Sequence, residues 1–404
     1  MNMLPGSRRC HCLVKAAIFL VLTALITGVV GCTGGGGQDL PPSKDLEIQD
    51  WYDLNAVRDN LEGNHMLMND LNSTTPGYEE LAGPTANGGK GWEPIGTYHP
   101  DGAIARTGFM GTFDGQGYEI RDLFINRPKE DDVGLFKYVD DGVIEDVGVT
   151  NVTVIGRDYV GALGGSIRDC TVSNSHCSGG VTGSYRVGGM GGGARCTLMD
   201  SYFTGSVTGL EYVGGLVGTN DDTVSKSHFT GEVTGGSFVG GLVGSNSWGD
   251  VFESYSTGNV TGYGYVGGVV GWNYGVVSNC YSTGSVIGTN CVGGLVAKNL
   301  DTVDKCYSTG SVTGDKRVGG LVGSNCYDGL DRYATVSSSF WAIETSGQST
   351  SHGGTGKNTM EMRSIATFSD AGWNITAVTL NETNAAYIWN IVDDVSHPSL
   401  AWQS

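Results

Sequence analysis

A hexapeptide that returns every 26 or 27 residues constrains this chain more than any other feature. Residues 213–218 read Val-Gly-Gly-Leu-Val-Gly. Further copies, from close to loose, occupy residues 133–136, 160–165, 187–192, 239–244, 266–271, 292–297 and 318–323. A fixed period of this length is typical of repeat architectures, in which each unit packs only against its neighbours. We therefore expect the chain to stack repeated units along an axis.

Three other sets of residues keep the same period. They are an aromatic column, an asparagine column and a valine column: Tyr202, Phe229, Tyr255, Tyr281 and Tyr307; Asn220, Asn246, Asn273, Asn299 and Asn325; Val207, Val233, Val260, Val286 and Val312. The runs between them are rich in Val and Thr, which favour strands, and are separated by Gly and Asn, which favour corners. No run has the apolar period of a helix. Each unit is therefore predicted to hold two or three short strands.

The simplest arrangement of such units is one coil per repeat. Equivalent residues then stack ~4.8 Å apart, so that eight recognisable coils span ~40 Å. Inside the coils, valines are expected to stack on valines and tyrosines on tyrosines. Asparagine side chains are expected to form hydrogen bonds to one another along a corner. The sequence predicts an all-β fold, a single-stranded parallel β-helix or β-solenoid with coils of about 26 residues. Right-handed coils are expected because parallel crossovers almost always have that hand.

The regular positions of the glycines, and not their number, support this interpretation. There are 68 glycines among 404 residues, a content that would also suit a disordered chain. The glycines recur in step with the valines, however, and this favours close packing and corners. The two adjacent glycines of each hexapeptide are expected to form a bulge that turns the following leucine inward.

The repeat array predicts three folded segments. Residues 131–344 are assigned to the solenoid. Residues 46–130 do not share the period and are predicted to form an N-terminal cap with the first strands, including a short helix near 50–61 and a hairpin over 108–120. Residues 345–404 are predicted to form a C-terminal cap. Because an open solenoid end exposes unpaired strand edges, three C-terminal tryptophans are expected to cover that end: Trp373, Trp389 and Trp402.

The start of the chain predicts export. Basic residues precede an apolar run at 16–30 that is short for a membrane span, and residues 1–31 therefore have the pattern of a signal peptide. Residues 29–32, Val-Val-Gly-Cys, resemble a bacterial lipobox. That resemblance implies cleavage before Cys32, a lipid on its thiol and a membrane as partner through that anchor, at the cell surface. The alternatives are an ordinary signal peptide or an uncleaved anchor. Residues 32–45 are predicted to form a Gly- and Pro-rich tether.

Seven cysteines follow Cys32, and two pairs of them are spaced by one period. Cys170 with Cys196, and Cys280 with Cys306, would each lie in one column of adjacent coils. The coil spacing falls within the range of a disulfide, although parallel Cα–Cβ vectors strain the bond. Both pairs are therefore candidate disulfides, and buried free thiols that fill a ladder are the alternative.

The repeats also resemble a known family. The hexapeptides, with Tyr-Ser-Thr-Gly-Ser-Val-Thr-Gly between them at 307–314 and nearly so at 281–288, resemble the GLUG motif of secreted and surface proteins. The match covers residues 133–340, and segments 111–117 and 353–357 look like sequences that flank such arrays. The resemblance implies an extracellular surface β-solenoid. The motif accompanies adhesins and some immunoglobulin-cleaving metallopeptidases, and no catalytic residue belongs to it.

Signatures of catalysis are not found. The chain has no H-E-x-x-H sequence, so the metallopeptidase association does not carry over, and we predict no catalytic residue, metal site or cofactor. The net charge of −19 and the lack of a basic patch predict no nucleic-acid partner. Carboxylates are plentiful but spread over turns. The competing hypothesis is a carbohydrate-active β-helix enzyme, a polysaccharide lyase or hydrolase, for which carboxylates would have to converge on one face.

The residue before each first valine is the most informative surface position. If the valine points inward, its neighbour points outward. This would build an aromatic stripe, with further aromatics at the next corner: Tyr159, Tyr185, Tyr212, Phe238, Tyr263, Tyr265, Trp248, Trp272, Tyr274 and Tyr327. Exposed aromatics in a row suit a glycan or an extracellular protein ligand, and the alternative is that they brace the solenoid. The sequence thus predicts a surface-anchored binding, adhesion or structural module.

Overall fold

The structure is a computed structural model that describes residues 45–96, 108–326 and 334–403. These described residues belong to one compact unit. The predicted signal peptide, the lipidation site Cys32, the tether up to residue 44 and the stripe residue Tyr327 lie outside the described residues and stay predictions.

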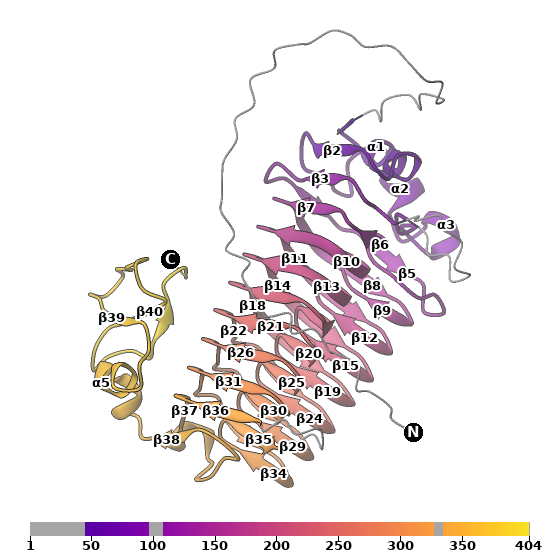
Figure 1. Cartoon of the computed structure of the whole chain (residues 1–404). Helices are drawn as coiled ribbons and strands as arrows, with labels where there is room; N and C mark the ends of the chain where they lie inside the picture. The colour runs from indigo at the N-terminus through magenta and orange to yellow at the C-terminus, as the bar shows by residue number, and fades with distance from the viewer. Residues whose placement is uncertain (1–44, 97–107, 327–333, 404) are drawn as a thin grey trace, which may run out of the picture. The chain divides into compact units, whose positions relative to one another are not determined.

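Parallel strands in three long sheets form the body of the solenoid (Figure 1). Sheet A contains β1 (Leu46–Ile48), β2 (Asn64–Leu67), β3 (Thr112–Asp114), β6 (Phe136–Asp140), β7 (Val143–Glu145), β10 (Gly164–Ser173), β13 (Gly191–Met199), β16 (Val217–Asn220), β17 (Thr223–Ser225), β20 (Val243–Asn246), β21 (Asp250–Phe252), β25 (Val270–Asn273), β26 (Val276–Ser278), β30 (Val296–Asn299), β31 (Thr302–Asp304), β35 (Val322–Asn325) and β36 (Thr335–Ser337).

Sheet B contains β4 (Glu119–Arg121), β5 (Phe124–Asn126), β8 (Gly148–Ile155), β11 (His176–Thr182), β14 (Tyr202–Thr208), β18 (His228–Thr234), β22 (Tyr255–Ser256), β23 (Asn259–Thr261), β27 (Tyr281–Ser282), β28 (Val286–Ile287), β32 (Tyr307–Ser308), β33 (Val312–Thr313), β37 (Phe340–Ala342) and β38 (Thr355–Lys357). Sheet C contains β9 (Asp158–Val160), β12 (Tyr185–Gly188), β15 (Glu211–Gly214), β19 (Ser237–Gly240), β24 (Gly264–Gly267), β29 (Asn290–Gly293) and β34 (Lys316–Gly319).

One coil passes through all three sheets before the next begins. Strand β15 in sheet C leads to β16 and β17 in sheet A and then to β18 in sheet B, after which β19 starts the next coil in sheet C. Each strand pairs in parallel with its counterpart one coil later, so Val213 lies beside Val239. The predicted parallel β-solenoid with coils of about 26 residues is confirmed. Its handedness stays a prediction.

A corner, not a bulge, lies within each hexapeptide. In the coil of β15 and β16, the bend falls at Gly215 and Leu216, between the end of sheet C and the start of sheet A. Val213, Leu216 and Val217 are all fully buried. The expectation of a bulge is therefore wrong: a change of direction between two sheets lets all three side chains face the core, which a single straight strand does not allow.

The asparagine column forms the predicted ladder. Each Nδ2 donates to the Oδ1 of the next coil, over 2.9 Å from Asn220 to Asn246, 2.8 Å to Asn273, 2.8 Å to Asn299 and 2.9 Å to Asn325. The first four of these side chains are fully buried. Bonds to backbone carbonyls of the same turn, such as Asn246 Nδ2 to Gly249 O at 2.8 Å, complete their hydrogen bonding. This corner of the coil is therefore polar on the inside, and its asparagine side chains are hydrogen-bonded.

The candidate disulfides are not formed. Cys170, Cys196, Cys280 and Cys306 are buried free thiols. The last two belong to a second ladder, made otherwise of serines, in which a backbone N–H donates to the side chain of the next coil. The Cys306 Sγ accepts from the Cys280 N–H at 3.4 Å and donates to the Asp304 carbonyl at 3.2 Å. In this ladder the thiols of Cys280 and Cys306 thus take the place of serine hydroxyls.

The N-terminal flank joins the solenoid earlier than its sequence indicates. It contains α1 (Trp51–Ala56), η1 (Val57–Asp59), α2 (Tyr78–Leu81) and α3 (Ala86–Gly89). The predicted short helix is present as α1, and Asp50 caps it by accepting from the Tyr52 and Asp53 N–H groups. The predicted hairpin is wrong, because β3 pairs with β2 and β7 in sheet A whereas β4 pairs with β8 in sheet B. Long connections hide the period here while the strands still stack.

The C-terminal segment packs along the side of sheet B. It contains α4 (Ile343–Ser346), η2 (Glu361–Arg363), α5 (Ile365–Ser369) and a small sheet of β39 (Ile375–Ala377), β40 (Trp389–Ile391) and β41 (Ser399–Leu400). The Trp389 indole N–H donates to Asn279 Oδ1 at 3.1 Å, and that of Trp402 donates to the Glu253 carbonyl at 3.0 Å. The expectation that the tryptophans cover the open end is therefore wrong for Trp389 and Trp402, which lie against the side of two successive coils. Trp373 donates to the Ser338 carbonyl at 2.7 Å, just before β37 in the last coil.

The C-terminal segment covers an outward-facing aromatic ladder on sheet B. Its rings are stacked 4.7–5.0 Å apart and belong to His176, Tyr202, His228, Tyr255, Tyr281 and Tyr307. The predicted aromatic column is correct for its last three members, but Tyr202 pairs with His228 and not with Phe229. Phe229 stands one position further on and faces the core beside Phe203. Burial by the C-terminal segment raises the pKa of Tyr281 and of Tyr307.

His228 in this ladder makes the fold sensitive to acid. Burial lowers its pKa from 6.5 to about 4. Between these two values the unfolded chain binds a proton at this residue that the folded chain does not, so stability falls as the pH falls from 6.5 towards 4. We expect His228→Phe, which keeps the stacking but cannot titrate, to lose several degrees less Tm than the parent protein between neutral pH and pH ~4.5.

The measurement is the Tm of both proteins across that pH range. Other titrating groups, including His65 and His397, remain in the variant, so their contribution cancels in the comparison. If the Tm of both proteins fell equally as the pH is lowered, the assignment of the acid sensitivity to His228 would be wrong.

Candidate ligand-binding site

The stripe predicted from the sequence forms on the outside of sheet C. The residue before each first valine has a left-handed backbone, with φ between 52° and 60°, at Tyr159, Arg186, Tyr212, Phe238, Tyr265, Cys291 and Arg317. This conformation costs a bulky L-residue about 1–2 kcal/mol, and Gly, Asn or Asp normally occupies it. The strand bends outward at this residue, so that the valine after it returns to the core.

Four aromatic rings follow one another along these coils. Tyr185 meets Tyr212 edge-on at 5.0 Å, Tyr212 stacks on Phe238 at 4.7 Å, and Phe238 stacks on Tyr265 at 5.1 Å. Burial raises the pKa of Tyr185, and the neighbouring Tyr212 adds to the shift. The structure thus brings these predicted residues together in one continuous row.

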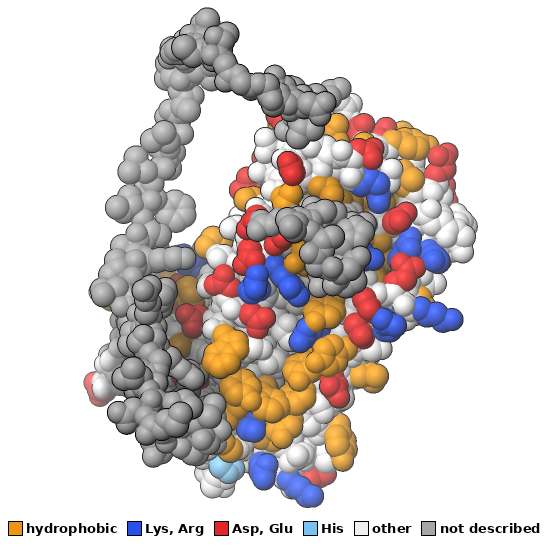
Figure 2. Space-filling view, turned by 45° about the vertical axis from the view of Figure 1, so that its right-hand side comes forward, with side chains coloured by type: hydrophobic (Ala, Val, Ile, Leu, Met, Phe, Trp, Pro, Cys, Tyr) orange, Lys and Arg blue, Asp and Glu red, His pale blue; other side chains and the backbone are white. Residues whose placement is uncertain are grey.

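A neighbouring column on sheet A extends the row sideways. Trp272 on β25 packs against Phe238 at 4.5 Å and Tyr265 at 5.2 Å, and Tyr274 stacks on Trp272 at 5.5 Å. The Lys298 ammonium lies 4.6 Å from the Trp272 ring centre, in a cation–π contact. In Figure 2, which brings the side of sheet C forward, hydrophobic side chains gather over the lower half of the visible face.

Three predicted members stand apart from this row. Tyr263 and Trp248 are 69% and 68% exposed, and Trp248 reaches the row through Tyr274, at 6.3 Å. Tyr159 lies at the other end, where the Arg186 guanidinium is 4.7 Å from its ring centre. Within the same column Cys291 is fully buried, and burial raises its pKa to about 11.

Sequence reasoning missed a small pocket beside Tyr159. Its volume is about 150 Å³, and its walls include Tyr159, Ser166, Arg168, Arg186, Gly193, Ala194, Arg195, Thr219 and Asp221. The floor is the sheet A column that holds Trp272 and Lys298 further along, here occupied by the small residues Ser166, Gly193 and Thr219. Arg168 and Arg195 occupy opposite positions on the neighbouring strands β10 and β13. Their spacing of 27 residues, which is one coil, is the sequence signal from which the pocket could have been found.

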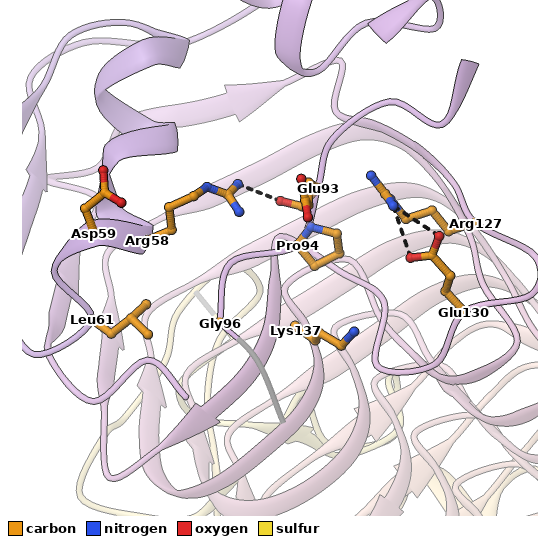
Figure 3. A pocket seen from close by; sticks show the side chains of 9 residues that line it. All are labelled: Arg58, Asp59, Leu61, Glu93, Pro94, Gly96, Arg127, Glu130 and Lys137. Atoms are coloured by element: carbon orange, nitrogen blue, oxygen red, sulfur yellow. Dashed lines mark hydrogen bonds and ion pairs between the residues drawn. The ribbon is translucent and has the colours of Figure 1, made fainter. Parts of the chain in front are cut away.

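A larger hollow of about 340 Å³ lies among the N-terminal elements (Figure 3). Charged side chains of both signs line it, and they bond to one another. Arg58 Nη2 donates to the Glu93 carbonyl at 2.9 Å, and Arg127 Nη1 donates to both carboxylate oxygens of Glu130 at 3.0 and 3.2 Å. These bonds within the fold account for Arg58, Arg127 and Glu130.

Carboxylates do not define a site in the described residues. The corner column that contains Asp200 continues through Lys226, Glu253, Asn279 and Lys305, a set of mixed charge. Within the described ranges no group of three or more His, Cys, Asp or Glu side chains could hold a metal ion.

Comparison with known proteins identifies the same repeat. The family model of the GLUG motif matches residues 209–234, 262–287 and 288–313. Halomucin of Haloquadratum walsbyi is 34% identical over 165 residues, which are 41% of this chain and 2% of halomucin. The chain therefore spans only a small part of this relative's length.

Two solved structures are also similar. One, described as an IgA1 protease, has a TM-score of 0.42 and 16% identity, over 76% of this chain and 22% of that chain. The other, from Bacteroides ovatus and provisionally assigned as an immunoglobulin A1 protease, has a TM-score of 0.47 and 16% identity, over 90% of this chain and 94% of that chain. Both likenesses are too distant to bear on activity.

Within the described ranges, no helix is both long enough and apolar enough to cross a membrane. The family match covers three of the coils whose strands stack in register along sheets A, B and C. The chain is therefore a β-solenoid that carries GLUG-motif repeats.

Proposed function

We propose that this protein is an extracellular β-solenoid module that is held at a cell surface by a lipid on Cys32 and binds a glycan or an extracellular protein through its aromatic stripe. The similarity to halomucin and the GLUG-motif solenoid both fit a surface module. The signal-peptide pattern and the lipobox-like residues 29–32 support export and anchoring.

The observation that carries the binding role is the strain in the stripe. Tyr212, Phe238 and Tyr265 each adopt φ between 53° and 57°, where asparagine or glycine would fit at lower cost. Strained residues persist where the surrounding structure or a function maintains them. Their rings are only half-buried, so the strain keeps a flat apolar surface accessible to a ligand. Flat sugar rings and apolar protein side chains both suit such a surface.

We expect the double variant Tyr212→Asn, Tyr265→Asn to lose at least tenfold in affinity, or ~1.4 kcal/mol, for ligands bound by the parent. Asparagine tolerates the left-handed conformation, so the backbone should be kept. The test compares both proteins on a glycan and extracellular-matrix array, using the full chain with Cys32→Ser to prevent lipid attachment. Tyr118→Asn is the matched control, since Tyr118 is 39% exposed and lies outside the stripe. Unchanged binding by the double variant would remove the stripe as the ligand surface.

The competing proposal is a carbohydrate-active enzyme, for which Asp250 is the candidate general acid. Partial desolvation and the charges of Asp222 and Asp301 raise the pKa of this carboxyl group, and a hydrogen bond to the Val276 backbone opposes the shift. Asp250 itself is exposed on β21. Incubation of the array's positive glycans with the protein separates the two proposals. New reducing ends or unsaturated uronates that disappear in Asp250→Asn would favour the enzyme, and intact glycans would favour the binding module.

A further inference from the structure

We propose that the pocket beside Tyr159 binds the carboxylate or sulfate group of an acidic glycan whose sugar rings lie along the stripe. This inference rests on the proposed function and adds a ligand class to it. Three guanidinium groups and one carboxylate, Asp221, line the pocket. The chain as a whole has a net charge of −19, so this local excess of positive charge runs against its composition.

Two of the three arginines have unused hydrogen-bonding capacity. Arg195 is paired with Asp169. Arg168 and Arg186 form no ion pair within 4 Å with a carboxylate of the described residues, although the charge of Arg168 acts on Asp132 from a longer distance. Both guanidinium groups lie over aromatic rings, those of Tyr138, Tyr159 and Tyr185. The Nε of Arg186 is buried without a hydrogen-bond partner. A buried donor of this kind is costly unless a ligand satisfies it, and a guanidinium matches the geometry of carboxylate and sulfate oxygens.

The size and the floor of the pocket favour a single anionic group. Its volume of about 150 Å³ has room for a carboxylate or sulfate group together with its adjoining carbon atoms. A Cβ at Gly193 would lie 3.2 Å from the Tyr159 ring, so the lack of a side chain there keeps the pocket open. The Ser166 hydroxyl donates to Asp132, and its remaining lone pairs do not attract an anion. The arginines are therefore the groups that would hold the ligand.

The pocket is continuous with the stripe. Arg186 contacts both Tyr159 in the pocket wall and Tyr185, at 4.7 and 5.2 Å, and Tyr185 meets Tyr212, the next ring of the stripe. Lys298 supplies another cation at the far end, over Trp272. A chain that alternates flat rings with negative groups would find stacking surfaces along the row and cations at both ends of it. Acidic polysaccharides have this chemistry.

The test measures binding of four oligosaccharides to the full chain with Cys32→Ser: hyaluronan, its carboxyl-reduced form, chondroitin sulfate and its desulfated form. We expect an acidic form to bind at least tenfold more tightly than its neutralised or desulfated counterpart. Dependence on carboxyl reduction identifies the uronate as the bound group, and dependence on desulfation identifies the sulfate. The double variant Arg168→Gln, Arg186→Gln should abolish this preference, so that the acidic form binds no more tightly than its neutral counterpart.

Two further variants keep the test decisive. Thr219→Glu leaves both arginines in place but puts a carboxylate in the pocket wall, so it should abolish the preference even if the double variant folds poorly. Lys226→Gln removes one positive charge at a distant corner and should change nothing. Equal losses in Lys226→Gln, or an acidic preference that survives the loss of both arginines, would overturn the inference, as would arginine-dependent binding of single-stranded DNA without a glycan preference.

These outcomes separate the two proposals. Stripe-dependent binding of neutral and acidic forms alike would leave the proposed function standing and refute the pocket. Binding of no oligosaccharide and no matrix protein would refute both.

Discussion

Gly214→Ala should unfold the central coils of the solenoid, with a loss of more than ~4 kcal/mol in the free energy of unfolding. A Cβ at this position would lie 2.0 Å from the Val217 carbonyl oxygen and 2.7 Å from that of Leu242. Both contacts are with backbone, so no side chain can move aside. One of the two carbonyls belongs to the next coil, and relief of the clash would have to separate stacked strands.

Denaturant unfolding followed by circular dichroism, with hydrogen exchange resolved by coil, checks this expectation. In a solenoid the damage should concentrate in the altered coil and its neighbours, because stability is a sum of nearest-neighbour terms. Gly180→Ala is the matched control: its nearest contact would be the Ser206 side chain at 3.5 Å, and its effect should stay within about 1 kcal/mol. Similar unfolding midpoints for the two variants would refute the packing argument.

Asn273→Ala should be the second most damaging change, with a loss on the order of 3 kcal/mol, because each buried polar group left without a partner costs about 1–3 kcal/mol. The Asn273 side chain bonds to Asn246 and Asn299 at 2.8 Å each, accepts from the Gly275 N–H at 3.2 Å and donates to the Gly275 carbonyl at 2.8 Å. Its removal leaves the Gly275 N–H and the Asn299 Oδ1 without these bonds in a buried corner. Neither group can turn to solvent without opening the coil.

The control lies at the end of the same ladder. Asn325 is only half-buried, so water can replace its bonds, and Asn325→Ala should cost a third as much or less. Equilibrium unfolding of the three proteins in the same buffer provides the comparison. A loss at Asn325 as large as that at Asn273 would show that burial does not govern the contribution of a ladder residue.

The repeat unit could be predicted because its cause is local. Strands of adjacent coils pair in register, so the spacing of the hexapeptides directly predicts that Val213 lies beside Val239 and that Tyr255, Tyr281 and Tyr307 stack. The phase within the unit was harder to predict. In each coil a left-handed corner residue stands two positions before the outward ring, so Lys226 marks His228 as the member of the column. His228 and Phe229 both carry a ring at nearly the right spacing, and the spacing alone did not distinguish them.

By itself, the sequence determined the coil, its period, the asparagine ladder and the row of exposed aromatics, since each of these depends on contacts between neighbouring coils. Tertiary structure alone decided where the C-terminal segment lies and which charged groups meet. Trp402 bonds to Glu253 across 149 residues, and no periodic pattern marks that contact. The arginine pocket likewise arises where small side chains on one sheet leave room between long ones on the next. A hollow of this kind depends on the three-dimensional positions of side chains from separate coils, and these positions follow from packing rather than from spacing along the chain.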